Sequence, residues 1–507
     1  MKPAISWGFA AAFALCLPLA AQQHQTEIPT TFGETIDVRV VNVEAVVTAA
    51  SGERVRGLGA ADFRLLVDGR EVPVEYFAEI EEGTSVAAEK APVAAGEEVA
   101  RNYLVYLDDA FSLANRRNAV LDKLERDLTL LGPADRMAIL AFDGTRIQVL
   151  CPWSGDRKTL AAALAQARQR PASGGEMLAH QRKLQADVTW LYDNADSIST
   201  GDSVSAAGTN TDEIGTALDW MSRRNSPEAR TELGKATEAA TAALRGFEAP
   251  PGRKLMLLLS GAWSLSVAPR LHAPIVHAAN ELGYTVYPVD ASQSSLNETS
   301  ALDTLARATG GRLLVPADNA VLREAVNDSA SYYWLGFTPT WKANDRGHSV
   351  TVEVRRPGLT VRARNGFTDL SHRTAAAIKA ESVLLFGGAA NDRRLIVQLG
   401  EPKRRGSAFE VPVTLGVPVE ALALTPKGKG YLADIPLAVA TEEDDGRRSN
   451  LSGPHLRVVL ASVPPAGTYA RFKTAVLVRD PKQRLIFTIH DPVSGEALWG
   501  EAGTEVK

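Results

Sequence analysis

The chain has 507 residues, 45% of them hydrophobic and 23% charged, with a formal net charge of −5. This composition is that of an ordinary globular protein, and the length suggests about three domains. Because the charge is small and no dense basic run occurs, the sequence argues against nucleic acid and anionic lipid as partners.

The first residues are typical of a secretory signal peptide. Lys2 precedes an apolar stretch from Ile5 to Leu19, and small residues up to Ala21 come before a polar run. This stretch is shorter than the ~20 residues of a membrane-spanning helix, which makes a membrane anchor the weaker alternative. We expect residues 1–21 to be removed and the protein to be exported, periplasmic or extracellular, with no membrane span thereafter. Cys151 would then be the single remaining cysteine, which we expect to be buried as a small hydrophobic residue.

A small β module is predicted at residues 26–80, because apolar and polar residues alternate there with the period of half-buried strands. Asp68-Gly69 lies between two alternating arms and predicts a tight hairpin. Residues 81–100 are rich in Gly, Ala, Glu and Ser. Their lack of large apolar side chains predicts a linker.

Residues 101–337 alternate between apolar strands and amphipathic helices, which predicts a mostly parallel sheet covered on both faces. Asp143-Gly144 predicts one antiparallel edge hairpin. The interval 170–249 is predicted to be an insertion, either a partner-binding surface or a spacer. The predicted strands are Tyr103–Leu107, Met137–Phe142, Ile147–Cys151, Lys254–Leu259, Tyr284–Val289 and Arg312–Val315, and the predicted helices are Asn115–Leu131, Arg157–Arg168, Pro227–Phe247, Ala268–Leu282, Thr299–Ala308 and Ala320–Ala330.

Two further β segments follow. Residues 338–370 contain short strands with Pro357-Gly358 as a turn and are interpreted as a β extension. Residues 383–500 contain many short alternating strands, which favours an immunoglobulin-like β-sandwich. Glu442–Arg448 is acidic but lacks the ligand spacing of a calcium loop, so we interpret it as a hairpin tip.

The most informative motif lies at the end of the first predicted strand of the α/β region. Asp108-x-Ala110-x-Ser112 resembles the Asp-x-Ser-x-Ser adhesion motif of von Willebrand factor type A domains, with alanine in place of the middle serine. Together with the leader, the β module and the passage Tyr332–Phe367, it makes the chain resemble the VWFA-related proteins common in Acidobacteria. The resemblance implies an α/β fold with a Rossmann-like type A domain between two β domains.

In the resembled family this motif binds Mg²⁺ together with a threonine of a second loop and an aspartate after a later strand. Here Gly174-Gly175-Glu176 places Glu176 where the threonine is expected, with 208–211 as a rival alignment, and Ser260-Gly261-Ala262 lacks the aspartate. The candidate metal ligands are therefore Asp108, Asp109, Ser112 and Glu176. We expect an incomplete site with at most weak Mg²⁺ binding and no other cofactor. Alternatively, Asp108 and Asp109 cap the following helix or accept hydrogen bonds from loop amides.

These features predict an exported, non-enzymatic, adhesion-type protein-interaction module with a degenerate metal site and a protein partner of unknown identity. The candidate partner-binding residues are Asp108, Asp109, Ser112, Ser260 and Trp263; Trp153, Trp190 and Trp220 are either further anchors or core. The alternative is a structural envelope component without a ligand of its own. A hydrolase has least support, because no nucleophile elbow precedes Ser260 and the histidines at 272 and 277 are five residues apart.

Overall fold

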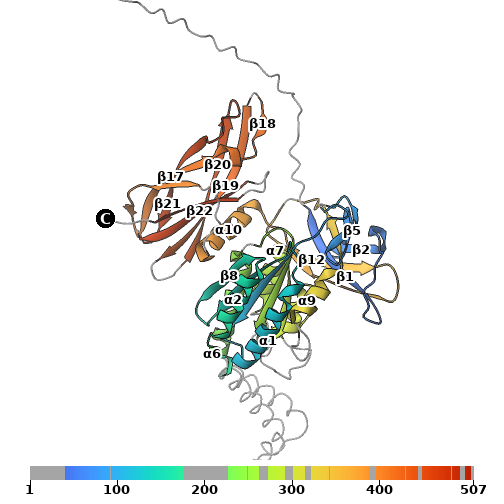
Figure 1. Cartoon of the computed structure of the whole chain (residues 1–507). Coiled ribbons are helices and arrows are strands. Elements are labelled where there is room, and N and C mark those ends of the chain that lie inside the picture. The colour runs from blue at the N-terminus through green and yellow to red at the C-terminus, as the bar shows by residue number, and fades with distance from the viewer. Residues whose placement is uncertain are drawn as a thin grey trace, which may run out of the picture. The chain divides into compact units, whose positions relative to one another are not determined.

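The structure is a computed structural model. It describes residues 40–91, 93–175, 227–247, 249–261, 272–291, 301–314, 321–341, 343–386, 395–428, 430–443, 448–480, 482–491 and 497–503. The predicted signal peptide and most of the predicted insertion lie outside the described residues, as do Glu176, Trp190, Trp220 and Trp263. The fold is mixed α/β (Figure 1).

The α/β part contains a five-stranded sheet of order β10-β9-β6-β7-β8. All neighbouring strands are parallel except β7 and β8, which pair antiparallel through the turn at Asp143-Gly144. The strands are β6 (Arg101–Asp108), β7 (Arg136–Phe142), β8 (Ile147–Ser154), β9 (Arg253–Ser260) and β10 (Tyr284–Asp290). The chain starts in the middle of the sheet at β6, moves to β8 at one edge, and then crosses to β9 and β10. This reversal is the topological switch point of a doubly wound fold.

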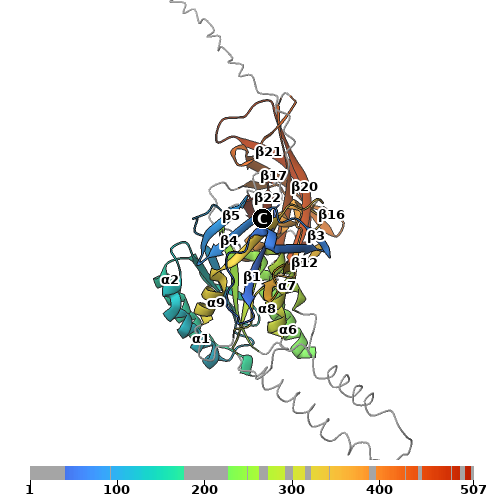
Figure 2. The ribbon, with the colours of Figure 1, turned by 90° about the vertical axis from the view of Figure 1, so that its right-hand side faces the viewer.

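Helices cover both faces of this sheet (Figure 2). On one face lie α1 (Ala114–Asp127), α2 (Arg157–Arg168) and α9 (Val321–Ala330), and on the other lie α6 (Pro227–Gly246), α7 (Ala273–Leu282) and α8 (Ala301–Ala308). The short 3-10 helix η2 (Leu128–Leu130) continues α1. Within the described part of the predicted sixth strand, Leu314 forms an isolated parallel bridge with Val289.

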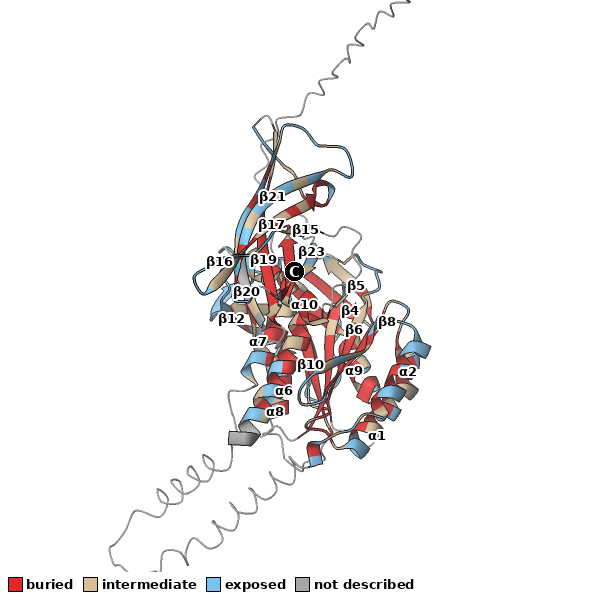
Figure 3. Ribbon diagram, turned by 90° about the vertical axis from the view of Figure 1, so that its left-hand side faces the viewer, coloured by how far each residue is buried: buried red, intermediate tan, exposed pale blue. Residues whose placement is uncertain are grey.

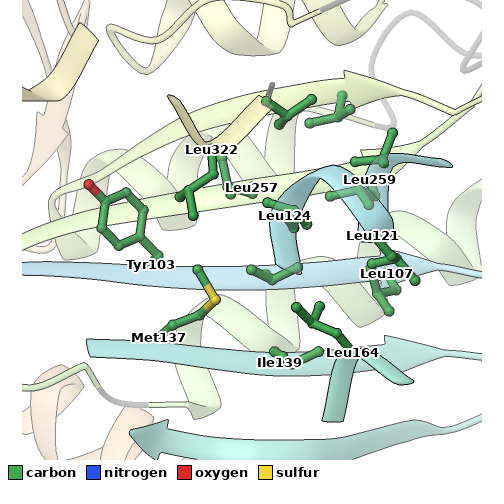
Figure 4. Close-up of a cluster of buried hydrophobic side chains, with 14 of the residues drawn as sticks. Tyr103, Leu107, Leu121, Leu124, Met137, Ile139, Leu164, Leu257, Leu259 and Leu322 are labelled. Carbon is green, nitrogen blue, oxygen red and sulfur yellow. The ribbon is translucent and has the colours of Figure 1, made fainter. Parts of the chain in front are cut away.

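The core lies on both sides of the sheet because successive strand residues point to opposite faces. Tyr103 and Leu107 pack against α1, α2 and α9 (Figure 4). Val105 belongs to the same cluster, whereas Leu104 and Tyr106 pack against the helices of the other face. Figure 3 shows the buried strands and the exposed outer sides of the helices. Cys151 is buried in this core, as predicted.

A β unit of two sheets is formed by segments that precede and segments that follow the α/β part in the sequence. One sheet has the order β13-β1-β11-β4-β5 and the other β14-β12-β2-β3. The predicted β module and the β extension thus pair with each other, and β11, predicted within the α/β region, lies between β1 and β4. The strands are β1 (Val41–Ala49), β2 (Phe63–Val67), β3 (Arg70–Val72), β4 (Tyr76–Glu81), β5 (Thr84–Glu89), β11 (Tyr332–Phe337), β12 (Gly347–Val354), β13 (Leu359–Ala363) and β14 (Gly366–Thr368), with the short helix η1 (Ala60–Asp62).

Two local predictions for this unit have opposite outcomes. The hairpin at Asp68-Gly69 is confirmed: both residues have positive φ, 50° and 76°, and join β2 to β3. The prediction of a linker at 81–100 is wrong, because β5 pairs with β4 and Thr84 forms a bridge with Glu98. Backbone hydrogen bonds hold this segment, so it needs few large apolar side chains.

The C-terminal part has two antiparallel sheets that share one core. One contains β15 (Ile396–Leu399), β16 (Lys403–Arg405), β17 (Ala408–Pro418) and β21 (Tyr469–Val478); the other contains β18 (Thr425–Lys427), β19 (Gly430–Glu443), β20 (Arg448–Leu460), β22 (Gln483–His490) and β23 (Ala497–Gly503), and η3 (Val419–Ala421) follows β17. Helix α10 (His372–Phe386) packs on β19 and β22 and also contacts α6, where Ser382 Oγ donates a hydrogen bond to the Gly246 carbonyl. No helix among the described residues is both long and apolar enough to cross a membrane.

Candidate functional site

The candidate site lies at the carboxyl edge of the parallel strands, at the switch point between β6 and β9. Asp108 is the last residue of β6 and Ser260 the last residue of β9. Ser260 Oγ donates a hydrogen bond of 2.6 Å to Asp108 Oδ2, and both residues are fully buried. The Phe111 N–H also donates to Asp108 Oδ1, at 3.3 Å. Ligands of doubly wound folds bind outside this edge.

Asp109 is held by an ion-pair network. Its backbone N–H donates to the Phe142 carbonyl at the end of β7, and its own carbonyl accepts from the Ser173 N–H, both at 2.9 Å. One carboxylate oxygen accepts a hydrogen bond from Arg117 Nη1, and the other accepts from Arg170 Nε at 2.7 Å. Asp109 is buried. Its negative charge is therefore matched by two guanidinium groups.

Arg117 links three segments through this network. It is among the largest fully buried side chains of the described residues. Beyond Asp109, its Nη2 donates to the Arg170 carbonyl at 2.7 Å and its Nε donates to Asn118 Oδ1 at 3.2 Å. Arg170 in turn donates through Nη1 to Gln148 Oε1 on β8 at 2.5 Å. The network joins the end of β6, the start of α1 and the segment after α2.

Burial controls the protonation of this region. It raises the pKa of the Asp109 carboxyl, and the hydrogen bond from Arg170 and the charge of Arg117 oppose that rise only in part. Burial also raises the pKa of Tyr106 well above its usual value, and the nearby Asp108 and Asp109 carboxylates add to the rise. Tyr106 is consequently a neutral phenol at physiological pH.

The Ser112 hydroxyl stands out, because it is buried and has no hydrogen-bond partner among the described residues. The backbone carbonyl of Ser112 accepts a hydrogen bond of 3.2 Å from the Gly174 N–H. A Cβ at Gly174 would lie 2.5 Å from that carbonyl oxygen, so only glycine fits there. The structure thus brings the predicted second loop against the first; the rival segment 208–211 lies outside the described residues.

The described donor set does not fit a resident Mg²⁺. Such an ion needs about six oxygen ligands in an octahedron. The Asp109 carboxylate accepts hydrogen bonds from two guanidinium groups, Ala110 has no side-chain oxygen, and the Ser260 hydroxyl donates to Asp108. Within the described ranges no group of three or more His, Cys, Asp or Glu side chains is placed to hold a metal ion.

Of the predicted site residues, the structure therefore brings Asp108, Asp109, Ser112 and Ser260 together and buries all of them. In this conformation none presents surface to a partner. Trp153 is partly buried and packs against Phe247 at the margin of the core, with ring centroids 5.6 Å apart, so it is not an exposed anchor.

Sequence reasoning missed Arg117 and Arg170. A signal for Arg117 was available: it lies three, four and seven residues before Val120, Leu121 and Leu124, all of which are buried on the inner face of α1. A charged residue on the apolar face of a helix indicates a buried ion pair. Arg170 gave no such signal, since it follows the end of α2.

No family model matches this chain, and no curated protein sequence matches it. Among solved structures the chain is similar to the SpRpn10 VWA domain, with 10% identity and a TM-score of 0.23 over 46% of this chain and 95% of that one. It is also similar to the TFIIH p34 N-terminal domain, with 15% identity and a TM-score of 0.19 over 45% and 95% of the two chains. A mutant of the PilB minor pilin from Streptococcus sanguinis has 10% identity and a TM-score of 0.25 over 58% and 78%. These values are too low to indicate a function.

Proposed function

We propose that this chain is an exported VWFA-related protein whose α/β part is a type A, protein-binding domain that works without a resident metal ion. The strand order with its single antiparallel edge, and the Asp108–Ser112 segment at the switch point, support the type A assignment. The C-terminal pair of sheets is compatible with an immunoglobulin-like sandwich.

One observation carries the metal-independent part of the proposal: the Asp109 carboxylate already has two guanidinium partners. In a metal-dependent adhesion site the cation offsets the carboxylates; here Arg117 and Arg170 supply positive charge from within the chain. The buried network then orders the loops at the carboxyl edge, and the partner contacts the outer surface of those loops.

Site-specific photocrosslinking tests this proposal. A photoreactive residue at Asn115, exposed at the start of α1, lies next to the carboxyl edge. The matched control is Arg126, exposed near the other end of the same helix. We expect Asn115 to give a discrete protein adduct in the native envelope, with and without EDTA, and Arg126 to give none. Adducts of equal yield from both positions, or loss of the Asn115 adduct with EDTA, would contradict the proposal.

The burial of Asp108, Asp109, Ser112 and Ser260 favours a second candidate, a structural envelope component. In that case the polar cluster only stabilises the domain. No discrete adduct would then form from Asn115, although the protein would still co-fractionate with the envelope.

A further inference from the structure

A second polar cluster lies where the β unit meets the α/β part, away from Asp108. There a cleft of about 430 Å³ is lined by the side chains of Thr48, Arg54, Arg312, Asn327, Asp328 and Arg362, among others. Arg54 follows β1, Arg362 is on β13, and Asp328 is in the last turn of α9. Three guanidinium groups from separate segments thus converge on one cleft.

Asp328 is the centre of this cluster. Its Oδ1 accepts from Arg54 Nη2 at 2.6 Å, and its Oδ2 accepts from Arg362 Nη2 at 2.6 Å and from the Tyr287 hydroxyl at 2.7 Å. Arg312 Nε lies 3.7 Å from Oδ1, too far for a hydrogen bond. Two arginines therefore saturate Asp328, and Arg312 adds a third positive charge.

The cluster has an excess of positive charge. Among the described residues, Glu324 on α9 is the other carboxylate in contact with it, 3.1 Å from Arg312 Nη2. In this part of the structure three guanidinium groups thus face two carboxylates. Among the described residues nothing accepts a hydrogen bond from Nε or Nη1 of Arg54, Nη1 of Arg312, or Nε of Arg362. Arg312 is 46% exposed, so the cleft is open to a ligand at this side.

We propose that this cleft binds a compact oxyanion, a phosphate or carboxylate group carried by a small ligand. Planar guanidinium groups match such groups with paired N–H donors and bind them in preference to monatomic anions. The excess charge attracts the anion, and the donors of three arginines surround it. This site does not depend on the function proposed for the carboxyl edge.

Inorganic phosphate is the first probe for the whole protein, at constant ionic strength balanced with sodium chloride. Isothermal titration calorimetry and thermal melting are expected to show saturable binding with a rise in midpoint. Methyl phosphate and acetate, added in parallel, distinguish phosphate-bearing from carboxylate-bearing ligands. Saturable binding of a phosphate probe or of acetate supports the proposed site.

Three variants assign the binding to this cleft. Arg312→Gln, which leaves the Arg54 and Arg362 pairs with Asp328 intact, is expected to weaken binding about tenfold. Glu324→Gln removes a competing carboxylate and is expected to tighten binding several-fold. The matched control is Arg307→Gln, which removes the same charge from the exposed Arg307–Asp303 pair on α8 and is expected to leave binding unchanged.

Two results would overturn the proposal. One is that none of the probes has an effect beyond that of chloride at equal ionic strength. The other is that Arg312→Gln and Arg307→Gln bind phosphate equally, which would assign the effect to general screening of charge. The opposite directions expected for Arg312→Gln and Glu324→Gln separate specific binding from a loss of folding.

Discussion

At the scale of single residues, the main feature of the carboxyl edge is the buried Asp109, whose carboxylate pairs with Arg117 and Arg170. Breaking a buried ion pair by removing one partner is more damaging than its net contribution suggests, because the remaining charge stays in a low-dielectric site. Arg117 is the partner whose loss matters most, since it is fully buried and also holds the Arg170 carbonyl.

Arg117→Met is expected to lower the free energy of unfolding by about 3–5 kcal/mol, because it leaves a buried carboxylate with one partner fewer. Urea denaturation followed by fluorescence measures the change. The matched control is Arg116→Met at the exposed neighbouring position of α1, which is expected to change stability by less than about 0.5 kcal/mol. A change below about 1 kcal/mol for Arg117→Met would show that the ion pairs of Asp109 contribute little to the free energy of unfolding.

The metal hypothesis gives a second residue-level prediction. The wild-type midpoint of thermal melting is expected to stay constant as Mg²⁺ or Mn²⁺ is added to millimolar concentration. The double variant Ala110→Ser, Gly261→Asp restores the serine and the aspartate that the resembled motif has and this chain lacks, and its midpoint is expected to rise with Mn²⁺. Saturating ion at a hundred times its Kd contributes about 2.7 kcal/mol. A Mn²⁺-dependent rise already present in the wild type would refute metal independence.

At the scale of elements, Gly174 sets how closely the segment after α2 approaches the loop after β6. Gly174→Ala places a Cβ against the Ser112 backbone and is expected to destabilise the fold by about 1–3 kcal/mol. The control is Gly175→Ala, whose Cβ would meet, among the described residues, the Leu113 side chain at 3.8 Å; this variant is expected to be neutral. Differential scanning calorimetry of both variants measures the difference. Equal midpoints would show that the two segments separate easily.

The elements also show what the sequence can predict. Periodicity located β6, β7, β9 and α2 within one or two residues, because their side chains are buried in regular patterns. It failed for β5, where backbone pairing rather than burial of large side chains fixes the strand. The site was predicted in part. Asp108 and Ser260 are in contact because they end neighbouring parallel strands, which the sequence pattern located. The contact between Asp109 and Arg170 joins residues that are 61 apart, and Arg170 lies in a loop that has no periodic sequence pattern.

At the scale of the whole chain, Asp328 connects the α/β part to the β unit through Arg54 and Arg362. Burial tends to raise the pKa of its carboxyl, but the charges and hydrogen bonds of Arg362 and Arg54 outweigh it and hold the pKa below its ordinary value. A depressed carboxyl pKa contributes stability that is present above the unfolded-state pKa and is lost as the pH falls through the folded-state value.

Asp328→Asn is therefore expected to lower the free energy of unfolding by about 3–5 kcal/mol at neutral pH, and with it the midpoint of thermal unfolding. The loss is expected to become progressively smaller as the pH falls below about 4. Melting curves of wild type and variant between pH 7 and pH 2.5 measure the gap. Asp122→Asn, which removes an exposed partner of Arg168, is the control and is expected to leave a small gap at every pH. A gap for Asp328→Asn that stays constant down to pH 2.5 would contradict the assigned ion pairs.

The pairing of β1 with both β11 and β13 has a mechanical consequence. Tension applied between residue 41 and the segment after residue 363 would load these antiparallel ladders first, because they join the two arms of the chain that flank the α/β part. Because Val41 pairs with Phe337 and Ala45 with Ala363, the pulled residues lie at the same end of both ladders, so the residue pairs would separate one after another. The sheet that contains Asp108 would not bear the load before β1 has separated.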